Sequence, residues 1–159
     1  MKCTCCGKEL GEFTTDISYQ LPDAVWRIPE EERDKRAKFN SDLCSLGDRF
    51  YIRGIAYIPI NGTKEEFGWG FWAEVTEEGF RRYLSIYEID GSEEEPILGT
   101  LANTPPGYPS VESQQVQIFF GPASDRPRFM FKESAHPLFR EQVHGISIER
   151  VHELNNEIS

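Results

Sequence analysis

The clearest pattern in the chain is an alternation of apolar and other residues over two neighbouring runs. In each run every second residue is apolar or small, which is the period of a β-strand with one buried face. The sets are Phe50, Ile52, Gly54, Ala56, Ile58 and Ile60 in the first run, and Phe67, Trp69, Phe71, Ala73 and Val75 in the second. Asn61-Gly62 lies between the runs and marks a turn, so the pattern predicts a hairpin.

Matching small residues to large ones across the turn predicts the register of this hairpin. The expected neighbours are Ile58 with Trp69, Ala56 with Phe71, Ile52 with Val75 and, on the other face, Arg53 with Glu74. That other face is half aromatic and half charged. We interpret it as a sheet face partly covered by the N-terminal segment; the alternative is a binding surface.

Other segments have helical patterns or the marks of short strands. Expected helices are 29–39, one capped by Thr76, one from Pro137 to the stop at Gly145, and one from Ser147 to about Asn156. Expected strands are 97–101, 115–120 and 128–132, and the prolines of 103–110 predict a rigid loop. Because βαβ alternation is missing, we expect an α+β fold with a mostly antiparallel sheet, flanking helices and an N-terminal cysteine knuckle.

Length and charge restrict the classes of protein to consider. The 159 residues predict a single domain, in which 1–44 pack on the sheet and helices of 50–159. No run approaches the roughly 20 apolar residues of a membrane helix, and no hydrophobic segment precedes the first cysteine, so a cytoplasmic location is expected. The 27 acidic residues outnumber the 17 basic ones, giving a net charge of −10. This charge repels nucleic acid and anionic membranes and favours a basic protein partner.

Three of the four cysteines lie within the first six residues. Cys3-x-x-Cys6-Gly7 has the spacing of a metal knuckle, in which two thiolates on a tight turn hold an ion, and zinc is the expected ion. Candidates for the other two ligands are Cys44, Cys5, His136, His144 and His152. We expect Cys44 as the third ligand, and a distant histidine, for which His136 is our choice, or a water as the fourth. Cys5 is a poor simultaneous ligand, because it lies between the two turn thiols and would strain the loop.

Two other states of the cysteines remain open. They can be reduced, unliganded thiols in a frayed N-terminus, or they can form disulfides. A disulfide is disfavoured in a cytosolic protein, where thiols stay reduced.

No catalytic set stands out in the sequence. Cys44 with a histidine and Asp42 would make a cysteine nucleophile, but metal binding or packing accounts better for the cysteines. We therefore expect a non-enzymatic, immunity-like module that binds a protein partner and contains a structural zinc site. The expected partner-binding residues are Tyr108 in the rigid loop and the acidic Glu93, Glu94 and Glu95. The alternative is a zinc-dependent hydrolase, which needs an open coordination position.

Several short motifs together resemble one bacterial family. They are Cys3-x-x-Cys6-Gly7, Asp42-x-Cys44, Phe50-x-Ile52-Arg53-Gly54, Phe67-x-Trp69-Gly70-x-Trp72, Pro105-Pro106-x-Tyr108-Pro109, Arg126-Pro127, His136-Pro137-Leu138 and Gly145-Ile146-Ser147. In this order they make the chain similar to the domain-of-unknown-function family 2199 nearly end to end. The resemblance implies a bacterial, cytosolic, single-domain protein with no established activity. Similar sequences carry a histidine three residues after the knuckle glycine, where this chain has Leu10.

Overall fold

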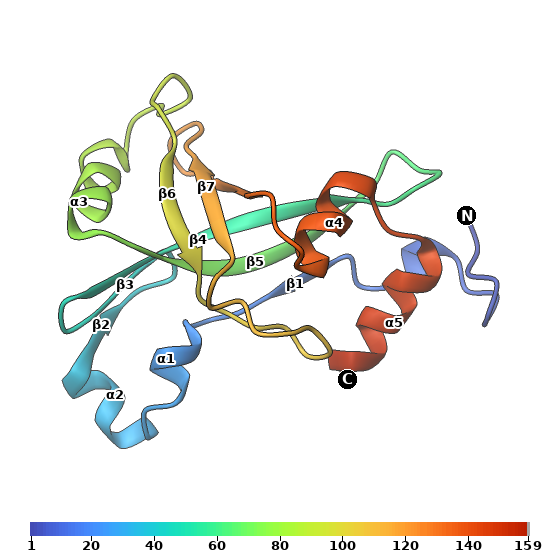
Figure 1. The fold of residues 1–159 in the computed structure, drawn as a ribbon, viewed down its shortest axis with the longest axis horizontal. Coiled ribbons are helices and arrows are strands. Elements are labelled where there is room, and N and C mark those ends of the chain that lie inside the picture. Colours follow the sequence, from blue (N-terminus) through green and yellow to red (C-terminus); the bar gives the residue numbers. More distant parts are fainter. Residues whose placement is uncertain (159) are drawn as a thin grey trace.

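The computed structural model describes residues 1–158, and its centre is one mixed sheet of eight strands (Figure 1). The strands are β1 (Asp16–Ser18), β2 (Ala37–Phe39), β3 (Leu43–Leu46), β4 (Arg49–Pro59), β5 (Glu66–Val75), β6 (Ile97–Leu101), β7 (Gln115–Phe119) and β8 (Arg128–Phe131). The α-helices are α1 (Asp23–Trp26), α2 (Glu30–Arg36), α3 (Glu77–Ile86), α4 (Pro137–His144) and α5 (Ile148–Ile158), with a 3-10 turn at Leu10–Glu12. The expected combination of helices and a sheet is confirmed.

The sheet closes on itself, which the sequence did not predict. Its order is β1-β5-β6-β7-β8-β4-β3-β2, and β4 also pairs with β5, so five strands form a closed ring. Two pairs are parallel, β1 with β5 and β8 with β4. Closure depends on the length of β4: its first half pairs with β3, and Ile55 further along pairs with Arg128 of β8. The sheet is therefore mixed and closed rather than mostly antiparallel.

The hairpin of β4 and β5 confirms the predicted alternation but not the predicted register. Ala56 lies opposite Trp69, and Gly54 lies opposite Phe71, so the strands are shifted by two residues from the expected pairing. The turn is shorter than predicted, because the Ile60 amide already donates to the carbonyl of Glu65 at 3.1 Å. Position 54 must be glycine here, since a Cβ would lie 2.3 Å from the Phe129 ring.

The shift also changes the predicted ion pair. Arg53 lies opposite Trp72 and donates to the carbonyl of Ser41 at 2.9 Å. Glu74, which lies opposite Tyr51, instead pairs at 2.7 Å with Arg49, two residues closer to the start of β4. The predicted pair of Arg53 with Glu74 is therefore wrong.

The two faces of the hairpin belong to two apolar clusters. The larger cluster contains the alternating set of both strands together with buried residues of α3, α4 and α5. The smaller one lies on the other face and consists of Leu21, Val25, Ala37, Cys44, Tyr51 and Trp72. Since the first three of these belong to the segment before β3, the second sheet face is covered by N-terminal residues, as expected. The helix predicted for 29–39 ends at Arg36, because its last residues form β2.

A side chain of α4 fills a gap in the closed sheet. Beyond Ile55, β4 and β8 separate, and the buried side chain of Gln142 lies between them. Its Oε1 accepts from the Phe131 amide at 2.7 Å, and its Nε2 donates to the carbonyl of Phe129 at 3.0 Å. Gln142 thus satisfies backbone groups of β8 that the neighbouring strand does not reach. Among the described helices, none is long and apolar enough to cross a membrane.

Candidate metal centre

The first ten residues form a tight loop that presents three thiols. The Gly7 amide donates to the carbonyl of Cys3 at 2.8 Å, and the Cys3 amide donates back to the carbonyl of Lys8 at 2.8 Å. Gly7 has a φ of 76°, a left-handed conformation that glycine adopts without a steric penalty. The chain therefore reverses within five residues, as the knuckle pattern predicts, and the Cys5 thiol stays on the same side as that of Cys3.

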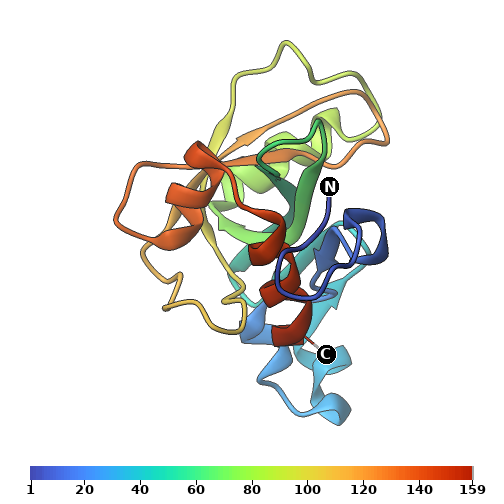
Figure 2. The ribbon, with the colours of Figure 1, turned by 90° about the vertical axis from the view of Figure 1, so that its right-hand side faces the viewer.

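Helix α5, although close to the other end of the chain in sequence, lies beside this loop and forms hydrogen bonds with it (Figures 1 and 2). Glu149, His152 and Asn155 recur every three residues and so share one face of the helix. Glu149 accepts from the Thr4 amide at 2.9 Å, and Asn155 exchanges two hydrogen bonds with the backbone of Thr14. On the neighbouring face, Val151 and Leu154 are buried in the main core. The helix thus fixes the N-terminal loop and the core at the same time.

Four potential ligands meet between the loop and α5. They are Cys3, Cys5, Cys6 and His152, and their ligating atoms all lie within 4.8 Å of one another. The Nδ1 of His152 is 2.9 Å from the Sγ of Cys5 and 3.5 Å from the Sγ of Cys3. The His152 ring stacks on Phe13 at 5.3 Å between centroids, which fixes its orientation.

The two closest thiols have shifted pKa values. A hydrogen bond from the Cys5 thiol, with further ones from the backbone and His152, lowers the pKa of Cys3 to about 6. The same hydrogen bond, together with burial and the charge on Cys3, raises the pKa of Cys5 to about 11. One thiolate is therefore present near neutral pH before any cation arrives, and thiolates are the form that binds metals.

Three thiolates and one imidazole make a donor set that suits zinc. Two ligands on a tetrahedral zinc ion lie about 3.8 Å apart when each is about 2.3 Å from it. The Sγ atoms of Cys3 and Cys5 are 3.0 Å apart, so a small outward movement of the loop would accommodate the ion. The cluster could thus hold a metal ion with four protein ligands.

The structure does not bring two of the expected ligands to this cluster. Cys44 lies in β3, at the opposite end of the molecule from the N-terminus in Figure 1, and belongs to the smaller apolar cluster. Burial raises the pKa of its thiol to about 11, which also makes it a poor nucleophile. His136 caps α4: its Nδ1 accepts from the Leu138 amide at 3.1 Å, and its Nε2 donates to the carbonyl of Pro109 at 3.0 Å.

Cys5 and His152 take the places of Cys44 and His136. Cys5, expected to be a poor simultaneous ligand, has its thiol on the same side of the loop as that of Cys3 and 2.9 Å from the Nδ1 of His152. His152 was one of five candidates, and its spacing with Glu149 and Asn155 was the signal that could have selected it.

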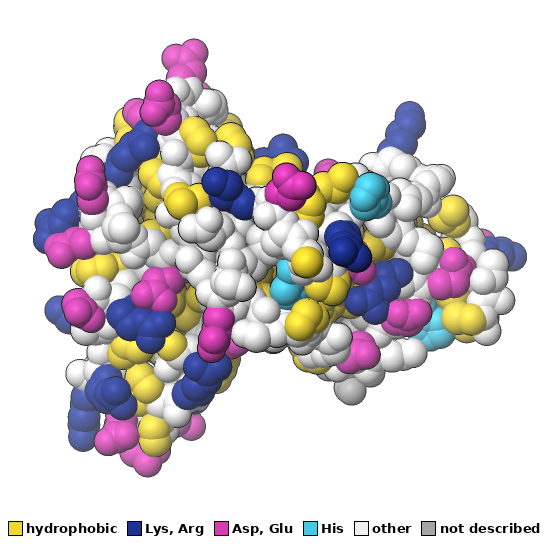
Figure 3. Space-filling model, in the orientation of Figure 1, with side chains coloured by type: hydrophobic (Ala, Val, Ile, Leu, Met, Phe, Trp, Pro, Cys, Tyr) yellow, Lys and Arg dark blue, Asp and Glu magenta, His cyan; other side chains and the backbone are white. Residues whose placement is uncertain are grey.

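The expected partner-binding residues also differ in their surroundings. Tyr108 is buried, since its ring lies edge-on to Trp69 and under the guanidinium of Arg150, and its hydroxyl contacts Glu141. It joins the proline-rich loop to α4 and α5, so most of its side chain is packed inside the protein. The acidic residues expected with it, Glu93, Glu94 and Glu95, are exposed. They belong to the loop before β6, where acidic side chains gather at the top of Figure 3.

Comparisons with known proteins place the chain in a family without assigning an activity. Neither the curated proteins nor the solved structures gave a match. The model of one bacterial family matches residues 2–146, which include the cysteine loop and end two residues before α5. The chain therefore belongs to the family described as an uncharacterized protein conserved in bacteria, the domain-of-unknown-function family 2199.

Proposed function

We propose that this protein is a non-enzymatic binding module for a basic protein partner and that a structural zinc ion holds its N-terminal loop on α5. The observation that carries the proposal is the cluster of Cys3, Cys5, Cys6 and His152. Four protein ligands fill a tetrahedral zinc shell, and a filled shell is typical of structural sites. A zinc-dependent hydrolase would need a position left for water, so the donor set argues against that alternative.

Zinc at this point would contribute directly to folding. It would join residues 3–6 to residue 152, near the two ends of the described chain, and metal binding that occurs only in the folded state adds its free energy to folding. Exposed hydrogen bonds such as that of Thr4 with Glu149 would stabilise the loop less than a bound zinc ion.

The metal part of the proposal is tested by zinc content. Protein purified in zinc should retain about one ion per chain after dialysis, and chelation should lower its melting temperature. Cys3→Ser should abolish both effects, whereas the matched control Cys44→Ser should keep its zinc. A protein that binds no zinc, or equal loss of zinc in both variants, would contradict the structural site.

The charge of −10 supports the binding part, because an acidic surface speeds encounter with a basic partner. The test is to identify a co-purifying protein, prepare it pure and measure its association rate. That rate should fall with salt and should fall again when Glu93, Glu94 and Glu95 are changed to Gln. Metal-dependent hydrolysis that is lost in Cys3→Ser, with no specific partner, would favour the enzyme instead.

A further inference from the structure

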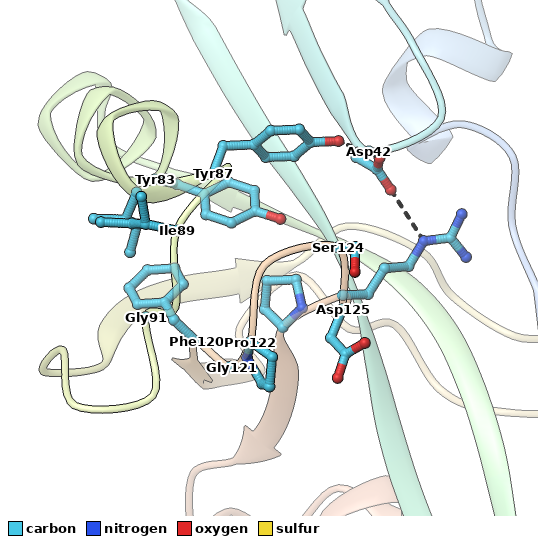
Figure 4. A pocket seen from close by; sticks show the side chains of 13 residues that line it. Asp42, Tyr83, Tyr87, Ile89, Gly91, Phe120, Gly121, Pro122, Ser124 and Asp125 are labelled. Atoms are coloured by element: carbon cyan, nitrogen blue, oxygen red, sulfur yellow. Dashed lines mark hydrogen bonds and ion pairs between the residues drawn. The ribbon is translucent and has the colours of Figure 1, made fainter.

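A small cavity of about 30 Å³ lies between the C-terminal end of α3 and the loop that joins β7 to β8 (Figure 4). Tyr83 and Phe120 form its apolar wall, with their rings stacked at 5.5 Å between centroids. Asp42, Ser124, Asp125 and Arg126 line its polar side. The polar side continues into an open groove of about 770 Å³ that passes Tyr57.

The hydroxyl of Tyr83 is directed into this cavity without a partner. The Tyr83 side chain is 6% exposed, and its hydroxyl has no hydrogen bond to another group of residues 1–158. The hydroxyl oxygen is not one of the fully buried unpartnered atoms, so it is reached from the cavity. Figure 4 shows this hydroxyl pointing toward the loop that carries Ser124. Because an unmet hydrogen bond costs about 1–3 kcal/mol, a group that enters the cavity gains by bonding to this hydroxyl.

One segment beside the cavity is strongly acidic. The segment 88–95 carries Glu88, Asp90, Glu93, Glu94 and Glu95 and has no lysine or arginine. Within it, Gly91 lines the cavity, and its amide donates to the carbonyl of Gly121 at 2.9 Å, which fixes the segment beside the cavity mouth. Of the nearby cations, Arg126 pairs with Asp42 and Arg82 with Glu94, whereas Arg128, which lines the adjoining groove, lies over the Tyr57 ring. Carboxylates still outnumber guanidiniums in the lining of the cavity and groove, with Asp42, Asp125 and Glu66 against Arg126 and Arg128, so the local charge favours a positively charged ligand.

Asp42 has capacity for a further hydrogen bond. Its Oδ2 accepts from the Tyr87 hydroxyl at 2.5 Å, and its Oδ1 accepts from the Nε of Arg126 at 3.1 Å. A carboxylate oxygen can accept about two hydrogen bonds, so Oδ1 is not saturated by Arg126. A donor in the cavity would find two acceptors, this oxygen and the hydroxyl of Tyr83.

We propose that this cavity binds a primary ammonium group, with the Tyr83 hydroxyl and the Asp42 carboxylate accepting its N–H bonds. A volume of about 30 Å³ admits a group the size of a water molecule or an ammonium, but not a planar guanidinium. The alkyl chain of the ligand would lie in the adjoining groove. The ammonium group could belong to a lysine of the basic partner or to a free alkylamine. For the lysine, the inference rests on the proposed function.

The test is a titration followed by NMR at the amides of Gly91 and Ser124. The probes are n-butylammonium, N-acetyl-lysine amide and the same lysine compound acetylated on its side chain. The first two should give saturable shifts with a dissociation constant in the millimolar range, and the acetylated compound should give none. Tyr83→Phe should weaken binding about tenfold, as expected for a hydrogen bond to a charged group. Tyr19→Phe is the matched control, since its buried hydroxyl also lacks a partner, and it should change nothing.

The outcomes separate this inference from the proposed function. Binding of both amines, lost in Tyr83→Phe, supports the cavity and the lysine source. Binding of n-butylammonium alone supports the cavity and counts against a lysine of a partner. The inference would be overturned by an absence of saturable shifts, by equal binding to Tyr83→Phe, or by equal shifts with sodium acetate. These outcomes do not depend on the association rates that test the proposed function.

Discussion

The Sγ of Cys5 lies 2.9 Å from the Nδ1 of His152, although 147 residues separate them in the chain. This contact makes α5 part of the cysteine loop. His152→Ala should therefore reduce the zinc retained after dialysis and make the melting temperature less sensitive to chelation, since three ligands remain instead of four. Zinc content and thermal unfolding measure the two effects. His144→Ala, an exposed change at the end of α4, should behave like the unmodified protein.

Trp69 should contribute far more to stability than Trp26. Trp69 is 1% exposed and lies in the main core, so Trp69→Ala should lower the free energy of unfolding by about 3–5 kcal/mol. Trp26 is 43% exposed and contacts the guanidinium of Arg33, so Trp26→Ala should cost about 1 kcal/mol or less. Denaturant unfolding gives both values. Similar losses in the two variants would contradict the assignment of Trp69 to the core.

Gln142→Leu should destabilise the protein although leucine is apolar and similar in size. The change leaves the Phe131 amide and the Phe129 carbonyl without their partner, at a cost of about 1–3 kcal/mol for each buried group. Gln117→Leu is the matched control on the exposed side of β7 and should change stability by about 0.5 kcal/mol or less. Hydrogen exchange should also speed up at Phe131 in the first variant only.

Asp42 should make part of the stability depend on pH. Burial alone would raise its pKa, but hydrogen bonds from Tyr87 and Arg126 and the charge of Arg126 outweigh burial, and the pKa is lowered. A carboxyl with a lowered pKa stabilises the fold above its ordinary pKa of about 4, and this contribution is lost as the pH falls through the folded-state value. Asp42→Asn should therefore lose less stability on acidification than the unmodified protein. Asp34→Asn, exposed in α2, should show the full acid sensitivity in urea unfolding at each pH.

The four cysteines should differ in reactivity. After chelation, iodoacetamide should modify the exposed Cys6 first and the exposed Cys5 more slowly, because the pKa of the Cys5 thiol is raised to about 11; added zinc should protect both. Cys44 should react only after unfolding, because it is 1% exposed and burial raises the pKa of its thiol to about 11. Mass spectrometry of the digested protein locates each modification. Rapid labelling of Cys44 in the folded protein would contradict its place in the smaller apolar cluster with Val25 and Trp72.

Local sequence patterns predicted which segments form strands and helices better than they predicted which segments pair or pack together. The alternation from Phe50 to Val75 identified both long strands, and Thr76 does cap α3, since its hydroxyl accepts from the Gly79 amide. The register was two residues off, because nothing in Asn61-Gly62 shows how many residues the turn uses. The sequence does not predict closure of the sheet, since closure depends on where along its length β4 meets β8.

The candidate metal site shows the same limit. The spacing of Cys3 and Cys6 indicated a metal knuckle, but the choice of the remaining ligands depends on which distant element docks on it. Cys44 lies far enough along the chain to return to the knuckle, but the sequence does not reveal that β3 places it in an apolar cluster instead. The prolines around Tyr108 correctly indicate a rigid loop, but they do not reveal that its ring packs edge-on against Trp69.

The closed sheet has a consequence for solubility. The strands β4 and β5 are long, apolar and rich in aromatic residues, and such segments pair with other chains when their edges are open. Here β4 has β5 on one side and β3, β8 and Gln142 along the other, so little of its backbone is available to a neighbouring molecule. The outermost strands, β1 and β2, have three residues each and carry exposed Asp16 and Lys38. The arrangement therefore protects its most aggregation-prone segments by leaving only short, charged strands at the margins.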